Sequence, residues 1–431
     1  KLGKLIVFYD ENKISIDGCT DITFSDDVQK RYESYGWQVL RGSMYNVKEI
    51  EDLVNMAKGE KNKPSIIILK SVIGKGAPNE GTAGVHGAPL GEEGCAAAKK
   101  ALGLPENEKF YVVPEAYKYF EEKRKELAAE EQKWNAEFDA WAKENPELAK
   151  KWDAYWNAKQ TAEVAAPSYK AGDKLATRDA SGKSLNCMAD RYEWLVGGSA
   201  DLQGPNKTKL KNDDGTYSAQ NRKGRTIEYG IREFAMSQVM SGINLHGGLR
   251  AFGATFLVFS DYLRGSLRVA ALSHIPNIYI FTHDSIYVGE DGPTHQPTET
   301  YAALRCIPNV QVLRPGDAEE TTEAWKMAIE TTDHPVCLIL GRQGLGVYEK
   351  ADSDWKNTIK CGAYIAKDCS GTPDITILAT GSEVTLAIEA AKLGEAKEKK
   401  IRVVSVLDRE LFESQDDALQ AKIIGGAKRI M

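Results

Sequence analysis

The sequence lacks the two features that would suggest a membrane or a nucleic acid as partner. No apolar run approaches the roughly twenty residues that a membrane-spanning helix requires. An excess of basic residues is also missing, since 56 Lys and Arg face 62 Asp and Glu and the formal net charge is −6. We therefore expect no membrane and no nucleic acid among the partners of this chain.

Cysteine occurs without a pattern. The seven cysteines are odd in number, scattered and never spaced as CxxC: Cys19, Cys95, Cys187, Cys306, Cys337, Cys361 and Cys369. This distribution favours reduced thiols over a disulfide framework. We therefore expect a cytoplasmic protein.

The chain also has no initiator methionine and no signal peptide. It enters a strand-like apolar run at 5–9 almost at once, and it stops at Met431 just after Lys428 and Arg429, where another strand is expected to start. We interpret it as an N- and C-terminally incomplete piece of a longer protein.

Apolar runs alternate with helix-length amphipathic segments over most of the chain. This alternation predicts an α/β protein of successive domains with mainly parallel sheets flanked by helices, and a smaller C-terminal α/β domain. A helix is expected at 47–58. Strands are expected at 5–9, 65–69, 194–196, 255–259, 278–281, 310–313, 336–340, 375–378 and 401–406.

The segment from about 115 to 159 is different, because it is charged and rich in Ala, Glu and Lys. Its aromatic residues recur at helical spacing: Trp134, Phe138 and Trp141, then Trp152, Tyr155 and Trp156. Helices that pack on a neighbouring surface explain this spacing better than stacking on a cofactor. With a linker at 165–168, the expected domains are 1–112, 113–168, 169–345 and 346–431.

The loop 283–297 follows the expected strand at 278–281 and is rich in titratable residues. Ligands bind beyond the carboxyl ends of strands in α/β sheets, so this loop is a candidate site. Three interpretations remain open. His283, Asp291 and His295 could hold zinc, the loop could be an ordinary surface loop, or the histidines could line a pocket for a hydroxylated or phosphorylated substrate.

The same loop carries a family resemblance. DSI at 284–286 and GEDGPTHQP at 289–297 closely resemble the signature of transketolases. Further blocks follow in the family's order: ISIDG at 14–18, HGAPLG at 86–91, GGSADL at 197–202, YGIREF at 229–234 and ATGSE at 379–383. The resemblance extends over essentially the whole chain.

The resemblance implies a thiamine-diphosphate-binding fold and a transferase of carbohydrate metabolism in the pentose phosphate pathway. Such an enzyme moves a two-carbon ketol unit from a ketose phosphate to an aldose phosphate through a thiamine diphosphate adduct. It also implies a homodimer with active sites at the subunit interface. In these terms 1–112 is the remainder of the diphosphate-binding domain, 113–168 a helical linker, 169–345 the pyrimidine-binding domain and 346–431 an incomplete C-terminal domain.

Three alternatives to this function stay open. The chain could belong to a dihydroxyacetone synthase, to a deoxyxylulose phosphate synthase, or to a catalytically silent paralogue that serves as an assembly subunit.

Cofactor-binding residues are implied by the matching blocks. Glu233 matches the glutamate that shares a proton with the cofactor's pyrimidine ring. The implied aromatic slot around that ring consists of Phe256, Phe259 and Tyr262, with Phe259 expected to stack on it. Asp201 is the further implied contact.

Metal binding is implied for two residues near the N-terminus. Asn12 matches the family's asparagine ligand, and Ile14 matches the residue that offers a backbone carbonyl. Hard oxygen ligands suit Mg²⁺, with Ca²⁺ or another divalent cation as the alternative. A carboxylate ligand is expected upstream of Lys1.

Substrate contacts are implied for six residues. His86 is expected beside the diphosphate and the reacting carbon, His283 and His295 on sugar hydroxyls, and Asp291 on the hydroxyl next to the carbonyl. Arg178 and Arg342 are expected to bind the terminal phosphate, since guanidinium matches phosphate geometry. With Glu233, the three histidines form the expected catalytic set.

One position departs from the family pattern. Where the family commonly has a phosphate-contacting serine, counting in register places Pro205, which offers neither a hydroxyl nor an amide hydrogen. The two arginines are therefore expected to carry phosphate binding.

Overall fold

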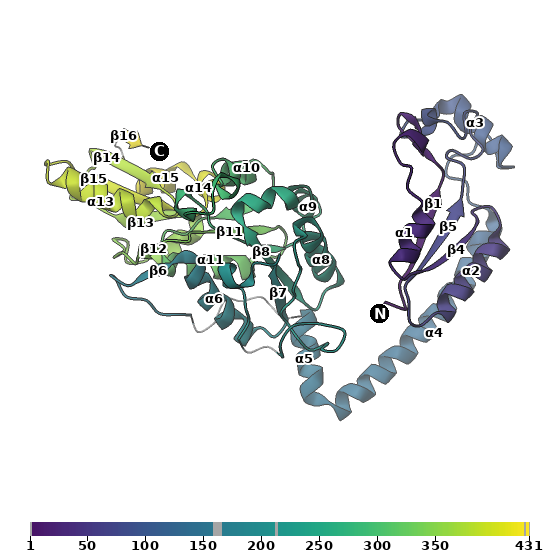
Figure 1. Ribbon diagram of the computed structural model, residues 1–431, viewed down its shortest axis with the longest axis horizontal. Helices are drawn as coiled ribbons and strands as arrows, with labels where there is room; N and C mark the ends of the chain where they lie inside the picture. The colour runs from purple at the N-terminus through teal and green to yellow at the C-terminus, as the bar shows by residue number, and fades with distance from the viewer. Residues whose placement is uncertain (1, 158–165, 212–213, 426–427, 431) are drawn as a thin grey trace. The chain divides into compact units, whose positions relative to one another are not determined.

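A computed structural model describes residues 2–157, 166–211, 214–425 and 428–430. The chain divides into two compact units, 1–141 and 142–431. Each unit is described by itself below (Figure 1). None of the described helices combines the length and the apolar content that crossing a bilayer would require.

A three-stranded parallel sheet forms the centre of the first unit. Its order is β1–β5–β4, with bounds Ile6–Glu11, Ser65–Lys70 and Gln38–Ser43. The central strand β5 is buried on both faces, as expected for an apolar run inside a parallel sheet. Strand β4 escaped prediction because Arg41 and other polar residues interrupt its apolar pattern.

The remaining elements of this unit surround or follow the sheet. They are β2 (Ile14–Ser15), β3 (Gly18–Cys19), α1 (Val28–Ser34), α2 (Val47–Gly59), α3 (Gly91–Ala101) and α4 (Pro114–Glu144), which runs just past the unit boundary. Helix α2 confirms the helix expected at 47–58, and it packs Leu53 and Ala57 against the sheet.

The helical character expected for 115–159 is confirmed by α4 and by α5 (Pro146–Asn157). Trp134, Phe138 and Trp141 stack on one another along α4, with ring centroids 5.3 and 5.5 Å apart. On α5, the Trp156 ring lies 5.9 Å from that of His246, within the second unit. The expected packing on a neighbouring surface therefore holds for α5.

The second unit is built on a five-stranded parallel sheet of order β10–β11–β9–β8–β7. The strands are β7 (Leu195–Ser199), β8 (Arg250–Phe256), β9 (Ile278–Thr282), β10 (Gln311–Leu313) and β11 (Val336–Leu340). The helices around it are α6 (Thr177–Arg191), α7 (Gln203–Asn206), α8 (Glu233–His246), α9 (Ser260–Leu272), α10 (Thr300–Arg305) and α11 (Ala318–Glu330).

Alternate residues of these strands enter two different cores. Ile278 and Ile280 pack with α6 and α11 on one face, whereas Tyr279 and Phe281 pack with α8 and α9 on the other. The sheet is thus covered by helices on both faces, which leaves the strand ends as the place where polar side chains can gather.

The strand expected at 255–259 was placed wrongly. Strand β8 begins at Arg250 and ends at Phe256, and Leu257–Phe259 is a 3₁₀ turn that leads into α9. The start of the strand was missed because it carries a charged residue, Arg250, which interrupts the apolar pattern. Arg250 is nevertheless buried, and its guanidinium donates to the backbone oxygens of Ala328 and Thr331.

A smaller C-terminal sheet has the order β13–β15–β14–β16, with β13 antiparallel and the other pairs parallel. Its strands are β13 (Ala363–Lys367), β14 (Ile375–Ala379), β15 (Ile401–Val406) and β16 (Lys428–Ile430), and the helices are α12 (Trp355–Thr358), α13 (Glu383–Glu395), α14 (Arg409–Glu413) and α15 (Asp417–Ile424). Strand β16 confirms that a strand starts near Lys428.

A two-stranded antiparallel pair, β6 (Lys174–Ala176) with β12 (Gly344–Gly346), completes the second unit. In the predicted linker, residues 166–168 have no regular structure and Ala165 lies outside the described residues. The division into four domains remains a prediction, because the compact units have their boundary at 141/142.

Candidate functional site

The polar residues predicted for the site follow the carboxyl ends of neighbouring parallel strands. Asp201 follows β7, Phe256 ends β8, His283 follows β9 and Arg342 follows β11. Asp201 and His283 have left-handed backbone conformations, with φ of 60° and 62°. Non-glycine residues rarely adopt this conformation, so the chain turns sharply where each strand ends.

His283 is the centre of this cluster. It is 3% exposed, its Nε2 lies 3.3 Å from Nη1 of Arg178, and its ring centroid lies 3.7 Å from that of Phe256. Burial, and after it the charge of Arg178, lower the pKa of His283 to about 4. The imidazole is therefore neutral at neutral pH.

The other predicted substrate residues also act on this imidazole. The carboxylate of Asp291 raises the pKa of His283, whereas the charges of Arg342 and His295 lower it. The fold therefore brings residues of three separate segments into one electrostatic neighbourhood: Arg178, Arg342, and His283, Asp291 and His295 of one loop.

The hydrogen bonds of His283 determine which nitrogen carries the proton. A guanidinium can only donate, so Nε2 must accept from Arg178 and the proton must sit on Nδ1. Nδ1 lies 2.7 Å from Oγ1 of Thr282, which must then accept from it. The Thr282 hydroxyl hydrogen is left to donate to Oδ1 of Asn206 at 2.6 Å.

The same sequence of bonds continues into the core. Nδ2 of Asn206 donates to Oγ of Ser199 at 3.2 Å, and this hydroxyl lies 2.6 Å from Oγ1 of Thr208. All four of these supporting residues are buried. Sequence reasoning missed Thr282, Asn206 and Thr208, because single polar residues in loops and strand ends give no signal of a shared network.

This network changes the expectation for His283. While both bonds hold, neither ring nitrogen is free to contact a sugar hydroxyl, so His283 orients Arg178. Nη1 of Arg178 also donates to the carbonyl oxygen of Pro205 at 3.3 Å. Pro205 thus does contribute, through its carbonyl and toward the arginine.

Arg342 lies against the loop that follows β9. A Cβ at Gly289 would be 2.8 Å from Nη1 of Arg342, so glycine leaves the space that this guanidinium uses. Glu290 lies 3.9 Å from Nη2 of Arg342 and is exposed. An exposed ion pair of this length is weak, and the guanidinium can therefore turn toward an anionic ligand.

An aromatic group adjoins the cluster. The rings of Phe256 and Phe259 are nearly parallel, with centroids 5.9 Å apart at 10°. Phe259 also meets His295 edge to face at 5.1 Å and lies 6.2 Å from Tyr262, which is 68% exposed. Two flat rings at and just after the end of a buried strand suit the aromatic slot that was predicted for the pyrimidine ring of the cofactor.

Glu233 is the first residue of α8 and is only 8% exposed. Although it begins a helix, it is therefore not a surface carboxylate. A buried carboxyl group suits a proton shared with a ring nitrogen, because water does not compete for it.

Asp284, next to His283, connects the loop with the C-terminal region. Burial raises the pKa of its carboxyl group, and Arg314 offsets that rise through an ion pair of 2.9 Å. Arg314 is 2% exposed, donates to the carbonyl oxygen of Thr380 at 2.8 Å and also binds Glu383. The ATGSE block at 379–383 therefore anchors the strand that carries His283.

Two of the three interpretations of the loop 283–297 can now be judged. The burial of His283 rules out an ordinary surface loop. Zinc has no structural support, because the described residues contain no group of three or more His, Cys, Asp or Glu side chains placed to hold a metal ion. A pocket for a hydroxylated or phosphorylated substrate stays a prediction.

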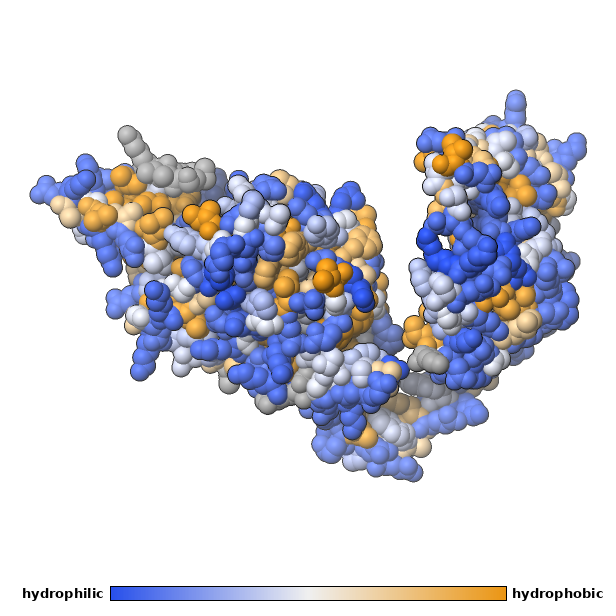
Figure 2. All heavy atoms as spheres, viewed as in Figure 1, coloured by the Kyte–Doolittle hydropathy of each residue, from blue (hydrophilic) through white to orange (hydrophobic). Residues whose placement is uncertain are grey.

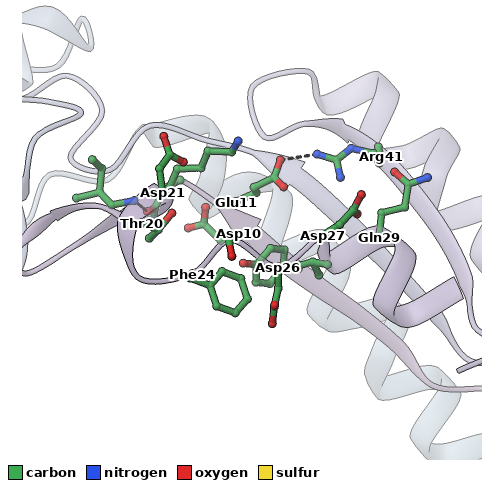
Figure 3. Close-up of a pocket in the computed structure, with 15 residues that line it drawn as sticks. Asp10, Glu11, Thr20, Asp21, Phe24, Asp26, Asp27, Gln29 and Arg41 are labelled. Carbon is green, nitrogen blue, oxygen red and sulfur yellow. Dashed lines mark hydrogen bonds and ion pairs between the residues drawn. The ribbon is translucent and has the colours of Figure 1, made fainter. Parts of the chain in front are cut away.

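The first unit contains a separate cavity of about 680 Å³ that includes the predicted metal ligands (Figure 3). Oδ1 of Asn12 accepts from the backbone N–H of Ile14 at 2.9 Å, which fixes the direction of the amide. Five carboxylates share the lining: Asp10, Glu11, Asp21, Asp26 and Asp27. Arg41 is ion-paired with one of them, Glu11.

Amide and carbonyl oxygens, the donors that Asn12 and Ile14 offer, are among those that Mg²⁺ and Ca²⁺ prefer. Three of the carboxylates are engaged in ion pairs, Glu11 with Arg41, Asp26 with Arg31 and Asp27 with Lys30. His86, in contrast, lies on an exposed loop that follows the 3₁₀ turn Ala83–Val85 of the same unit.

A parallel sheet covered by helices on both faces, with a buried glutamate at the start of α8 and with Arg342 after β11, fits an α/β protein of the thiamine-diphosphate-binding class. Residues 1–160 match the model described as transketolase, thiamine diphosphate binding domain, and residues 173–347 match the transketolase pyrimidine binding domain. Residues 362–431 match the transketolase-like C-terminal domain. The chain belongs to the transketolase family.

Individual relatives agree. A transketolase of Treponema pallidum is 54% identical over 438 residues, covering 100% of this chain and 66% of the relative, and one of Bacillus subtilis is 43% identical, covering 98% and 64%. The solved transketolase of Campylobacter jejuni has a TM-score of 0.89 at 39% identity, covering 100% and 65%. A transketolase of Pichia stipitis in complex with sedoheptulose 7-phosphate has a TM-score of 0.90 at 37% identity, covering 99% and 64%. The chain thus spans just under two thirds of the length of these proteins.

Proposed function

We propose that this chain carries out transketolase chemistry, the reversible transfer of a two-carbon ketol unit from a ketose phosphate to an aldose phosphate. The observation that carries the proposal is the gathering of Arg178, His283, Asp291, His295 and Arg342 at the strand ends of one sheet. These residues combine phosphate-binding and hydroxyl-binding groups, and Pichia stipitis relatives are solved with such sugar phosphates.

Each residue has a defined part in this proposal. Arg178 and Arg342 bind the terminal phosphate of the sugar, and His283 holds Arg178 in position. Asp291 and His295 contact sugar hydroxyls. These contacts orient the substrate, so that its carbonyl carbon is presented in a fixed position.

Thiamine diphosphate would supply the nucleophilic carbon that takes up the ketol unit. Glu233 would share a proton with the pyrimidine ring, Phe256, Phe259 and Tyr262 would provide apolar surroundings for it, and Asp201 would be a further contact. The protein thus contributes binding, orientation and proton placement, and the cofactor contributes the difficult chemistry.

In the first unit, Asn12 and the carbonyl of Ile14 would hold Mg²⁺, which neutralises the diphosphate. His86 is proposed to orient or move a proton at the substrate hydroxyl. Its exposed position leaves the imidazole accessible to a ligand.

A homodimer with active sites at the subunit interface is part of the proposal. Exposed apolar side chains gather on α8 and α9, and the hydrophobic colouring of this part of the second unit is visible in Figure 2: Phe234, Val239, Leu245, Tyr262, Val269 and Leu272. Apolar area of this kind is typical of surfaces that a partner covers.

All seven cysteines are free thiols, which supports a cytoplasmic location. The proposed reaction belongs to the pentose phosphate pathway.

The direct test is ketol transfer from xylulose 5-phosphate to ribose 5-phosphate by the complete protein with thiamine diphosphate and Mg²⁺. Parallel assays use formaldehyde as acceptor and pyruvate as donor. Preference for either would reassign the chain to a dihydroxyacetone synthase or a deoxyxylulose phosphate synthase. Failure to bind thiamine diphosphate in a titration would identify a silent assembly subunit.

A further inference from the structure

A cationic groove lies beside the phosphate cluster, formed by residues that none of the functions above uses. Its volume is about 390 Å³, and one wall is helix α6 while the other is the segment after α7. The lining contains four lysines and a single carboxylate: Lys183, Lys207, Lys209, Lys211 and Asp179. The local charge is therefore positive, whereas the formal net charge of the chain is −6.

The lysines face the groove because of an alternating sequence. In the segment 207–211, Thr208 and Leu210 are buried, Thr208 against Ser199 and Leu210 in the main core. Burial alternates along this segment, so Lys207, Lys209 and Lys211 share its exposed side, where they line the groove.

The backbone that carries these lysines is held firmly against α6. The Asn186 side chain donates to the carbonyl oxygen of Lys209 at 3.2 Å and accepts from the backbone N–H of Lys211 at 2.8 Å. A Cβ at Gly182 would lie 2.7 Å from the carbonyl oxygen of Lys207, so this close approach requires glycine. The groove is therefore part of the fold, whose shape does not depend on the lysine side chains.

The charges in the groove are largely uncompensated. Lys207 pairs with Asp179 at 3.5 Å, and Asp179 also lies 4.0 Å from Nε of Arg178. Among the described residues, no carboxylate lies within ion-pair distance of Lys183, Lys209 or Lys211. The ammonium of Lys183 lies 5.6 Å from the ring of Tyr169.

The groove adjoins the phosphate cluster but has its own residues. Gln203 and Gly204 line it, and the next residue, Pro205, accepts from Arg178. Similarly, Asp179 lines the groove and directly follows Arg178 in α6.

We propose that this groove is an anion site for a small molecule with two or more phosphate groups, separate from the cluster around Arg178 and His283. Several ammonium groups on a rigid backbone suit several phosphate oxygens, because each lysine acts as a flexible point charge. Inorganic pyrophosphate and nucleoside triphosphates share this chemistry, and the experiment distinguishes them.

The test is calorimetric titration of inorganic pyrophosphate into the complete protein saturated with thiamine diphosphate and Mg²⁺. The variant K183Q/K209Q/K211Q leaves the Lys207–Asp179 pair intact. Each exposed ion pair with the ligand contributes little, but the variant removes three of them, so its affinity for pyrophosphate should fall by about tenfold or more. The matched control, K392Q/K397Q/K399Q, removes the same charge from exposed residues of the C-terminal region and should bind as wild type does.

Two outcomes would overturn the proposal. Equal affinity of wild type and K183Q/K209Q/K211Q would show that pyrophosphate does not use the groove. An equal loss in the control variant would show a general charge effect. Arg342→Ala is a further variant to titrate. Loss of pyrophosphate binding in Arg342→Ala but not in the triple variant would place the anion in the cluster around Arg178 and His283 and would also contradict the proposal. A parallel titration with a nucleoside triphosphate shows which of the two sources binds more tightly.

A second readout rests on the proposed function. An anion in the groove would place negative charge next to Arg178, so added pyrophosphate should raise the Michaelis constant for phosphorylated donors in wild type more than in the triple variant. If the protein shows no ketol transfer, this kinetic readout cannot be used. The calorimetric titration still tests the groove, because it does not depend on activity.

Discussion

Two regions of this chain carry residues proposed to hold phosphate groups, and they differ in burial and charge. In the second unit, Arg178 is bonded to a buried, neutral His283 whose other nitrogen continues into a hydrogen-bond network. In the first unit, Asn12 lies in an open cavity with five carboxylates. The cluster in the second unit is arranged before any ligand arrives, whereas the cavity in the first unit is proposed to bind a phosphate group only through a cation.

The difference shows how each region depends on its surroundings. Preorganised donors lose little freedom when a ligand binds, so their effect is set by the protein's own bonds. A site that needs a metal is instead set by the concentration of that metal. Substitutions should therefore act on substrate affinity in the second unit and on metal dependence in the first.

The largest expected effect lies at Glu233, which is proposed to share a proton with the cofactor. Glu233→Gln should lower ketol transfer by about 10²- to 10⁴-fold, because an amide cannot share the required proton. Circular dichroism and unfolding curves should match wild type. Near-normal turnover at saturating thiamine diphosphate would mean that another group activates the cofactor.

The next effect concerns phosphate recognition. Arg342→Ala should raise the Michaelis constant for phosphorylated sugars by about tenfold or more, since a hydrogen bond to a charged group contributes roughly 1.5–3 kcal/mol. Unphosphorylated donors are the internal control and should change little. An equal loss for both classes of sugar would assign Arg342 a structural part.

In the first unit, removing the amide should act through the metal. Asn12→Ala should raise the Mg²⁺ concentration needed for half-maximal activity by about tenfold. This is the lower end of the losses in metal affinity that follow substitution of residues around a metal site. Asn12→Asp keeps an oxygen at this position and should restore most of the Mg²⁺ affinity. If both variants keep the wild-type dependence, the cation is bound elsewhere.

A smaller effect is expected from the network behind His283. Thr282→Val removes the acceptor of the Nδ1 proton and should raise the Michaelis constant for phosphorylated donors by about fivefold, the loss of roughly one hydrogen bond. Thr282→Ser keeps the hydroxyl and should behave as wild type.

Nitrogen NMR of His283 adds a readout that packing alone would not change. Wild type should show the proton on Nδ1, and Thr282→Val should show a changed tautomer or a mixture. Wild-type signals with the proton on Nε2 would contradict the bonding order inferred here.

The smallest effect is on stability against acid. The pKa of His283 is about 4 in the folded protein against an ordinary value of 6.5. Between these values the unfolded chain binds a proton that the folded protein does not, so stability falls as the pH drops through this window. Denaturant unfolding at pH 7 and pH 5 should show a larger loss for wild type than for His283→Gln. Equal losses would mean that His283 titrates normally.

Much of the fold was predictable because its strands are buried on both faces. Continuous apolar runs marked β5, β9, β11 and β15 within a residue or so of their bounds. Prediction failed where polar residues are buried with partners that lie far away in sequence. Arg250 is the clearest example, since its carbonyl partners are on and after α11, about eighty residues further on.

The candidate site divides in the same way. The family resemblance predicted roles for Arg178, His283 and Glu233, although nothing in it showed that His283 faces Arg178. The prediction for Pro205 considered only its missing hydroxyl and amide hydrogen, whereas the fold directs its carbonyl oxygen toward Arg178.

The sequence by itself determined the family, the order of elements and the identity of the polar groups, because these depend on residue types and their spacing along the chain. The tertiary structure decided which groups meet and in which protonation state. His283 is neutral and bonded through both nitrogens because burial removes water from it and because Arg178 and Thr282 stand on either side. A hydrogen bond depends on distances of a few ångströms between residues a hundred positions apart, and that information exists only once the chain has folded.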